Sequence, residues 1–182
     1  MGKAPLTASE TARRRFNVIV LPHLDDAYSL AKFLCGNGAD AEDIVQDACL
    51  RALAALETQA IERPRAWLLT IVRNVAFSFL ARKNPRLRLA ADIGDLERDG
   101  LLRVGDPAPD AEAQMIAADE GAMLRKAIAG LPLALRETLL MRVLSGLSYR
   151  EIATVTDAPI GTVMSRLARA RAALATIWGG AA

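Results

Sequence analysis

Aromatic side chains are scarce in this chain: phenylalanine, tyrosine and tryptophan together make up 4% of its 182 residues. Histidine occurs once, at His23, and cysteine twice, at Cys35 and Cys49. These few residues form no cluster with metal-ligand spacing, and two cysteines do not make a disulfide framework. Free cysteines of this kind are usually small core residues, and a thiol switch that responds to oxidation is the alternative. We therefore expect no metal and no cofactor.

Long apolar runs are also missing. No segment approaches the roughly 20 consecutive apolar residues that span a bilayer, and the first residues lack the apolar stretch and cleavage site of a signal peptide. There is no nucleophile–base pair and no glycine-rich phosphate loop. The sequence thus predicts a reduced cytoplasmic protein that does not insert into membranes and acts by binding rather than as an enzyme.

What the chain does contain favours helices. Hydrophobic residues make up 52% of the sequence, with alanine and leucine dominant and β-branched residues occurring singly, which predicts an all-α protein. Charge is unevenly spread: residues 1–91 hold 13 basic and 9 acidic side chains, residues 92–112 hold 2 and 7, and residues 113–182 hold 8 and 5.

The acidic middle also contains Gly94, Gly100, Gly105, Pro107 and Pro109, which break regular structure. We predict two small helical domains, at 1–91 and 112–182, joined by a flexible acidic linker at 92–111. The alternative is a surface loop within one domain, although structureless loops of this length are uncommon inside compact domains.

The segment "LSYREIATVTDAPIGTVMSRLARARAAL" near the C-terminus predicts a helix-turn-helix. Ser148 and Glu151 have the spacing of a capping box at the start of a short helix. "DAP" then forces a turn, and Thr162 is expected to cap the second helix. Two helices separated by a tight turn, the second one basic, are typical of a DNA-binding motif.

The second helix has one narrow apolar stripe at about 100° per residue, formed by Val163, Leu167, Ala170 and Leu174. Its remaining faces carry small and polar residues: Thr162, Met164, Ser165, Arg166, Ala168, Arg169, Arg171 and Ala172. Small side chains allow close approach to the DNA major groove, and arginine can reach phosphates or guanine edges. A solvated amphipathic helix is the alternative.

The segment "ADAEDIVQDACLRALAALE" predicts a helix with Asp40 as its N-cap. Its inward face is expected to contain Val45, Ala48, Cys49, Ala52 and Leu56. Asp43, Gln46, Asp47, Leu50 and Ala54 are expected to point outward. A leucine within an exposed acidic patch indicates a protein-binding face, and the residues alone leave a plain solvated face open.

A long helix is predicted through "RAWLLTIVRNVAFSFLARK", with an apolar stripe of Leu68, Ile71, Val72, Val75 and Phe79. Its other side carries Thr70, Arg73, Asn74, Phe77 and Ser78. An aromatic ring among polar donors can stack on an unpaired base, although Phe77 would equally pack against a neighbouring helix. The basic run that follows, "ARKNPRLR", includes Arg82 and suits a phosphate backbone or plain solvation.

Together, "DAEDIVQDACLRAL", "RAWLLTIVRNVA" and the helix-turn-helix segment resemble the extracytoplasmic-function (ECF) sigma factors of bacterial RNA polymerase. The resemblance covers residues 16–88 and 112–176, which match the order of conserved regions 2 and 4. It implies a stress-responsive transcription initiation factor held by an anti-sigma factor, whose partners are the β′ clamp helices and β flap of the polymerase and promoter DNA. Such linkers thread toward the polymerase channels.

The resemblance also implies roles for individual residues. The polymerase-binding set is Asp43, Gln46, Asp47, Leu50 and Leu53. The set for the −10 promoter element is Arg73, Asn74, Phe77, Ser78 and Arg82, with the loop at 57–65 assisting. The set for the −35 element is Thr162, Met164, Ser165, Arg166 and Arg169.

The chain departs from the family pattern at a few positions. Met164 stands where many relatives have lysine or arginine, Ala168 replaces a commonly larger residue, and the loop before "RAWLL" lacks an aromatic residue. The promoter sequence therefore cannot be inferred. One rival interpretation is a sigma-mimicking decoy that sequesters an anti-sigma factor, and a second is a one-component DNA-binding regulator.

Overall fold

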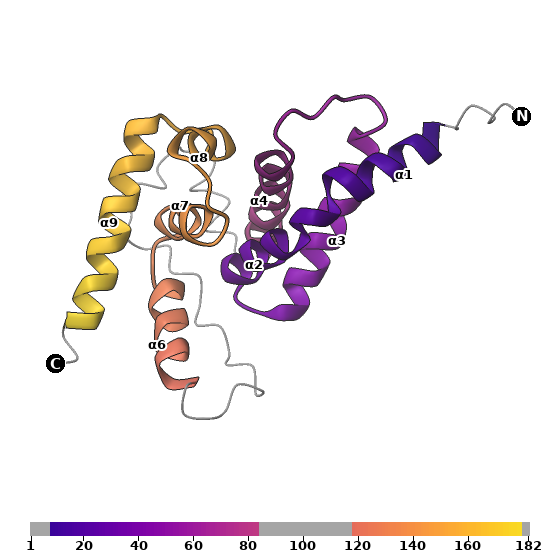
Figure 1. The fold of residues 1–182 in the computed structure, drawn as a ribbon. Coiled ribbons are helices and arrows are strands. Elements are labelled where there is room, and N and C mark those ends of the chain that lie inside the picture. Colours follow the sequence, from indigo (N-terminus) through magenta and orange to yellow (C-terminus); the bar gives the residue numbers. More distant parts are fainter. Residues whose placement is uncertain (1–7, 84–117, 180–182) are drawn as a thin grey trace, which may run out of the picture.

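The computed structural model describes residues 8–83 and 118–179, and in these ranges every regular element is a helix. The N-terminal bundle consists of α1 (Ala8–Ile19), the short 3₁₀ helix η1 (Leu21–His23), α2 (Leu24–Cys35), α3 (Gly38–Ala55) and α4 (Pro64–Lys83). The C-terminal bundle consists of α6 (Ala118–Ala129), α7 (Leu133–Val143), α8 (Tyr149–Thr156) and α9 (Ile160–Gly179). Figure 1 shows the two bundles side by side. The all-α prediction is confirmed, and the predicted linker lies outside the described residues.

In the N-terminal bundle, α2, α3 and α4 pack against one another through small side chains. Ala27, Ala31, Ala48 and Ala52 are completely buried, and their small size lets the helix backbones approach closely. α2 ends at Gly36, which adopts the left-handed conformation with φ 89°, a conformation that glycine accommodates without strain. Bonds from the Arg15 guanidinium to the backbone carbonyls of Leu56 and Gln59 attach α1 to the end of α3.

The start of α3 differs from the prediction. The N-cap is Asn37, whose side-chain oxygen accepts a hydrogen bond from the Asp40 N–H at 2.8 Å. The expectation of Asp40 as the cap was therefore wrong, because Asn37 has the extended backbone that a cap requires and Asp40 lies in the first turn. The inward face also shifts: Ala41 and Ile44 are buried, whereas Val45 and Cys49 are only half-buried.

α4 is buried over more of its circumference than its predicted stripe. Three residues of the predicted stripe are buried, namely Leu68, Val72 and Val75, and the other two, Ile71 and Phe79, are half-buried. Three residues outside that stripe are buried as well: Leu69, Ala76 and Leu80. The reason is that α4 packs against α2 and α3 and also against α8 of the C-terminal bundle. A helix covered from two directions has no simple amphipathic pattern.

The C-terminal bundle is organised around α7, which contacts α8 and α9. Pro132 is the N-cap of α7. Gly146 follows the end of α7 with φ 62° and allows the chain to turn into α8. The core between these helices contains four buried apolar residues: Leu147, Ile152, Val163 and Leu167.

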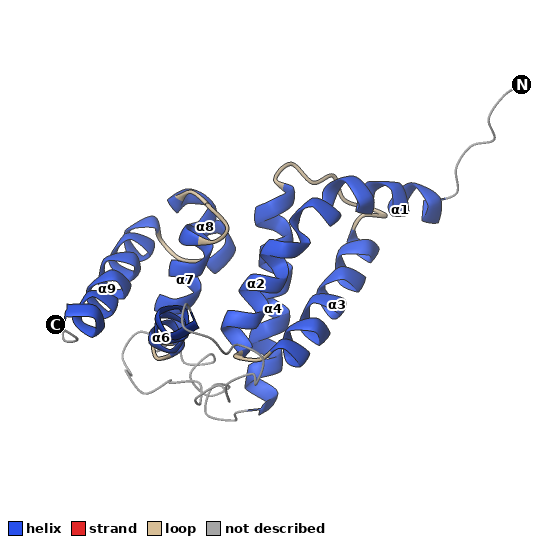
Figure 2. Ribbon diagram, turned by 60° about the horizontal axis from the view of Figure 1, so that its bottom comes forward, coloured by secondary structure: helices blue, strands red, loops and turns tan. Residues whose placement is uncertain are grey.

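The two bundles also pack on each other. α2 contacts α6 and α7, and α4 contacts α8, so that the buried side chains of both bundles form one continuous hydrophobic cluster. Figure 2 shows α7 beside α2 and α4 in a second orientation. The sequence did not indicate whether the two bundles would be separate or in contact.

Candidate nucleic-acid interface

The helix-turn-helix is built from the local signals that the sequence contains. The Ser148 Oγ accepts a hydrogen bond from the Glu151 N–H at 3.3 Å, and the Glu151 carboxylate accepts one from the Ser148 N–H at 2.8 Å. These two bonds form the predicted capping box and fix the start of α8. The Ser148 hydroxyl also donates to the Glu151 carboxylate, at 2.7 Å; this bond and the one from the Ser148 N–H lower the pKa of Glu151, because both stabilise the ionised carboxylate. α8 ends at Asp157, which adopts the left-handed conformation with φ 50°.

α9 packs inward through the predicted stripe: Val163, Leu167 and Ala170 are buried against α7 and α8. The helix begins at Ile160, so Thr162 lies within its first turn and is not its cap. That part of the prediction was wrong because Pro159, whose carbonyl accepts the Val163 N–H, already starts the helical hydrogen bonding. The stripe nevertheless determines which face of α9 is exposed.

The exposed face of α9 combines small, apolar and basic side chains. Met164 is 54% exposed, and Ser165, Ala168 and Arg169 are also exposed. The Ser165 hydroxyl donates to the Thr162 carbonyl at 2.9 Å, so its proton bonds to the helix itself. The face is therefore shaped for close approach to a groove, with Arg169 and Arg171 as exposed cations.

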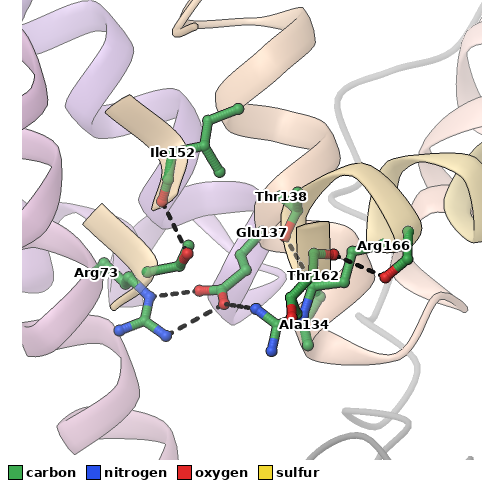
Figure 3. Close-up of polar contacts among 9 residues, drawn as sticks. Arg73, Ala134, Glu137, Thr138, Ile152, Thr162 and Arg166 are labelled. Atoms are coloured by element: carbon green, nitrogen blue, oxygen red, sulfur yellow. Dashed lines mark hydrogen bonds and ion pairs between the residues drawn. The ribbon is translucent and has the colours of Figure 1, made fainter. Parts of the chain in front are cut away.

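Arg166 is much less exposed than Met164, Ser165 and Arg169 on the same predicted face. Its side chain is only 12% exposed, and its Nη1 lies 4.0 Å from an Oε1 of Glu137 on α7. In Figure 3 the Glu137 carboxylate lies between Arg166 on α9 and Arg73 on α4. Arg166 thus belongs to a buried charge cluster as well as to the flank of the DNA-facing surface.

Glu137 was not predicted as a functional residue, although its side chain is 2% exposed and pairs with both arginines. The Arg73 Nε and Nη2 donate to its two oxygens at 2.6 and 3.2 Å. Burial raises the pKa of Glu137, and the two arginines oppose that rise. The sequence contained one weak signal: Arg136, Glu137 and Thr138 are three consecutive polar residues that span about 200° of a helix, and a helix packed on more than one side, as α7 is, buries some of them.

Arg136, next to Glu137, is also buried. Its guanidinium donates to the Ala129 and Leu131 carbonyls within the C-terminal bundle and to the Phe33 carbonyl of α2 at 3.5 Å. Burial lowers its pKa to about 10, so it remains protonated at neutral pH. Arg136 therefore caps the backbone of its own bundle and contacts the other bundle.

On the predicted −10 face of α4, some residues are exposed and others contact side chains of the protein itself. Asn74, Ser78 and Arg82 are exposed, and the Ser78 hydroxyl donates to the Asn74 carbonyl at 2.8 Å. Phe77 is half-buried, with the Arg73 guanidinium carbon 4.4 Å from the centre of its ring. Arg73 is therefore stacked on Phe77 and paired with Glu137 at the same time.

The predicted polymerase-binding face on α3 is exposed. Asp43 and Gln46 point to solvent, Leu50 is 63% exposed, and Leu53 is half-buried. Asp47 pairs with Arg51 one turn later, at 3.0 Å. A large exposed leucine flanked by acidic and amide groups fits a protein-binding surface.

Other kinds of site find no support within residues 8–83 and 118–179. No group of three or more histidine, cysteine, aspartate or glutamate side chains in these ranges is arranged to hold a metal ion. None of the helices described here is long and apolar enough to cross a membrane.

Two family models match the chain, namely Sigma-70 region 2 over residues 19–86 and Sigma-70 region 4 over residues 121–174. The ECF RNA polymerase sigma-E factor of Escherichia coli K12 is 32% identical over 168 residues, which cover 89% of this chain and 85% of that protein. The ECF RNA polymerase sigma factor SigE of Mycolicibacterium smegmatis is 32% identical over 167 residues, 91% of this chain. The chain spans 62% of the length of that mycobacterial relative.

Solved structures show the same arrangement of helices. A complex of the sigma factor RpoE with the anti-sigma factor NepR from Bartonella quintana contains a chain that is 28% identical, with a TM-score of 0.67 over 91% of this chain and 98% of the other. CnrH in complex with the cytosolic domain of CnrY is 25% identical, with a TM-score of 0.66 over 96% and 94% of the two chains. The matched regions contain the α3, α4 and α9 faces described above.

Proposed function

Because this chain belongs to the extracytoplasmic-function sigma factors of bacterial RNA polymerase, a family of transcription factors that are not enzymes, we propose that it binds the core polymerase and directs promoter recognition and transcription initiation. The observation that carries the proposal is the capped helix-turn-helix within the region 4 match, with the small and basic face of α9 exposed. The acidic face of α3, within the region 2 match, supports the same function.

Each matched region has its own task in this proposal. Region 2 binds the β′ clamp helices through the polymerase-binding set, which comprises Asp43, Gln46, Asp47, Leu50 and Leu53. It captures unpaired bases of the −10 element through Arg73, Asn74, Phe77, Ser78 and Arg82. Region 4 docks on the β flap and reads the −35 element through Thr162, Met164, Ser165, Arg166 and Arg169. The domain limits 1–91 and 112–182, with a linker at 92–111, belong to the same proposal.

This mechanism needs no covalent step. Two bundles that attach to separate sites on the polymerase raise each other's effective concentration. Region 4 supplies duplex affinity through phosphate contacts, so this affinity falls steeply with salt. Region 2 binds the melted strand in preference to the duplex and thereby shifts DNA toward the melted state.

We also propose that an anti-sigma factor holds this chain until a stress signal releases it in the cytoplasm, where the polymerase works. Support comes from the two similar solved structures, one of which is a sigma factor in complex with an anti-sigma factor. The decoy interpretation finds no support, because the matching relatives are named as sigma factors.

In-vitro transcription tests the proposed function. Purified chain and core polymerase are incubated with fragmented genomic DNA of the source organism, and the transcripts are sequenced. We expect new start sites that share upstream −35 and −10 motifs. A chain that binds core polymerase but initiates nowhere would be a decoy, and a chain that does not associate with core at modest ionic strength contradicts the proposal altogether.

A paired substitution locates the polymerase-binding face. Asp43→Ala combined with Asp47→Ala is expected to weaken binding to core polymerase while leaving the fold intact, because Asp43 is exposed and the surface pair of Asp47 contributes under about 1 kcal/mol. Glu57→Ala combined with Glu62→Ala removes the same charge from exposed positions outside α3 and is the matched control. Unchanged core affinity of the α3 variant, measured by surface plasmon resonance, refutes the assignment.

A further inference from the structure

The contact between the two bundles contains a charge cluster that the family match does not explain. Glu137 on α7 is buried, and its strongest partner is Arg73 on α4 of the other bundle. Its second partner, at 4.0 Å, is Arg166 on α9. One carboxylate thus faces an arginine from each of the two predicted DNA-reading helices, as Figure 3 shows.

The arrangement around this carboxylate resembles the way arginines bind a phosphate. Arg73 donates two roughly parallel N–H bonds to the two oxygens of Glu137, the geometry that guanidinium groups also use on phosphate oxygens. The Arg73 side chain is 17% exposed and is stacked on Phe77. In this arrangement Arg73 cannot give the same donors to DNA.

The pairing depends on the two bundles remaining in contact. Arg73 belongs to α4 and Glu137 to α7, and these two residues are separated by 64 positions in the sequence. One further polar contact crosses the same boundary: Arg136 donates to the Phe33 carbonyl at 3.5 Å. Separating the bundles breaks the bidentate pair and returns Arg73 to water.

We propose that Glu137 is an intramolecular latch: it holds the two bundles together by pairing with Arg73, and it must release Arg73 before region 2 can use that arginine on the promoter. Arg166 is the second arginine that the latch partly neutralises. This inference rests on the proposed function for its consequence at promoters, whereas the latch itself is a property of the free chain.

The consequence is an equilibrium between closed and open forms. When only the open form binds DNA through Arg73, the apparent affinity falls in proportion to the open fraction, so a chain that is open one-tenth of the time binds about tenfold more weakly. A polymerase that holds the bundles apart, or DNA that competes for Arg73, shifts the equilibrium toward the open form.

The test compares Glu137→Gln with Asp40→Asn in the full-length chain, free of polymerase. Both substitutions remove one negative charge, but Glu137 has two arginine partners, one of them in the other bundle, whereas the pair of Asp40 with Lys83 lies within the N-terminal bundle. Small-angle X-ray scattering measures the radius of gyration, and fluorescence anisotropy measures affinity for a labelled single-stranded 20-base DNA of mixed sequence at low salt. Circular dichroism confirms that each variant is folded.

We expect Glu137→Gln to have a larger radius of gyration than the wild type and an affinity for single-stranded DNA severalfold higher than that of Asp40→Asn. An unchanged radius of gyration, or an affinity equal to that of Asp40→Asn, overturns the latch. Glu137→Asp, whose shorter side chain draws the carboxylate away from Arg73, serves as a second variant with the same expected direction. Loss of folding in both variants also overturns the proposal, because a latch that opens cannot be required for the fold of either bundle.

This experiment is independent of the proposed function. It uses neither core polymerase nor a promoter, so a chain that fails to initiate transcription can still show the latch. Conversely, a transcriptionally active chain whose Glu137→Gln variant stays compact would refute the latch and leave the sigma-factor function intact.

Discussion

At the scale of single residues, exposure separates the predicted contacts into two kinds. Arg169 is exposed on α9, whereas Arg73 and Arg166 are engaged by the same buried carboxylate. An exposed arginine can bind DNA without first breaking a contact inside the protein. An arginine paired in a buried cluster must exchange one partner for another, so its net contribution to DNA binding is smaller.

Arg169→Ala is expected to cost about 1–3 kcal/mol in binding to a −35 site if the side chain reads a base. The fold should remain intact, since the side chain is exposed. Anisotropy titrations with the mapped −35 duplex and with a scrambled duplex provide the measurement. An equal loss on both duplexes would show that Arg169 contacts phosphate only.

Both cysteines are half-buried, and burial raises the pKa of the Cys35 and Cys49 thiols. A raised pKa reduces the thiolate fraction at neutral pH, and the thiolate is the reactive form. We expect both thiols to react with iodoacetamide more slowly than glutathione does, with rates that increase as the pH rises. Mass spectrometry follows the labelling, and rapid modification by mild peroxide would instead support the redox-switch alternative.

At the scale of elements, local capping accounts for the motif that carries the proposed function. The capping box starts α8, and the left-handed Asp157 ends it. Both features are encoded within about ten residues and need no distant contact. The starts of α3 and α9 were predicted less accurately: Asp40 and Thr162, the predicted caps, both lie inside the first turn. Where a helix begins depends on backbone conformations that residue type alone does not fix.

Ser148→Ala is expected to destabilise the fold by about 1 kcal/mol near neutral pH. Thr154→Ala, which removes an exposed hydroxyl from the same helix, is the control and should change stability by less than about 0.5 kcal/mol. Urea denaturation followed by circular dichroism gives both values.

The loss caused by Ser148→Ala should also depend on pH. Because the pKa of Glu151 is lower in the folded chain than in the unfolded one, the bond between its carboxylate and the Ser148 hydroxyl contributes fully above the unfolded pKa. That contribution disappears as the pH falls through the folded pKa. A stability difference from the wild type that stays the same at about pH 3 as at neutral pH would contradict this linkage.

At the scale of the whole molecule, the hydrophobic cluster extends through both bundles. α2 is shared between them, since it packs against α3 and α4 on one side and against α6 and α7 on the other. A destabilising substitution in α2 should therefore also destabilise the C-terminal bundle. In the open form that the latch proposal requires, this coupling would be lost.

Leu30→Ala tests the coupling, because Leu30 is a fully buried residue of α2. We expect a loss of about 2–5 kcal/mol from the emptied space. Hydrogen–deuterium exchange should increase in α7 as well as in α2, α3 and α4. Unchanged protection of α7 in a folded variant would show that the two bundles unfold independently.

The sequence by itself determined the helical class, the capping box, the buried stripe of α9 and the exposed acidic face of α3. These features follow from spacing, since a period of about 3.6 residues and a Ser-x-x-Glu pattern act within one or two turns. The family resemblance of the same motifs was confirmed by the matched regions.

Only the tertiary structure decided that the two bundles meet, that α4 is buried from two directions, and that Arg73 and Arg166 share Glu137. No periodic pattern specifies which residue 64 positions away will face an arginine. The physical reason is that a buried carboxylate needs its counter-charge in space, whereas the sequence displays only neighbours along the chain.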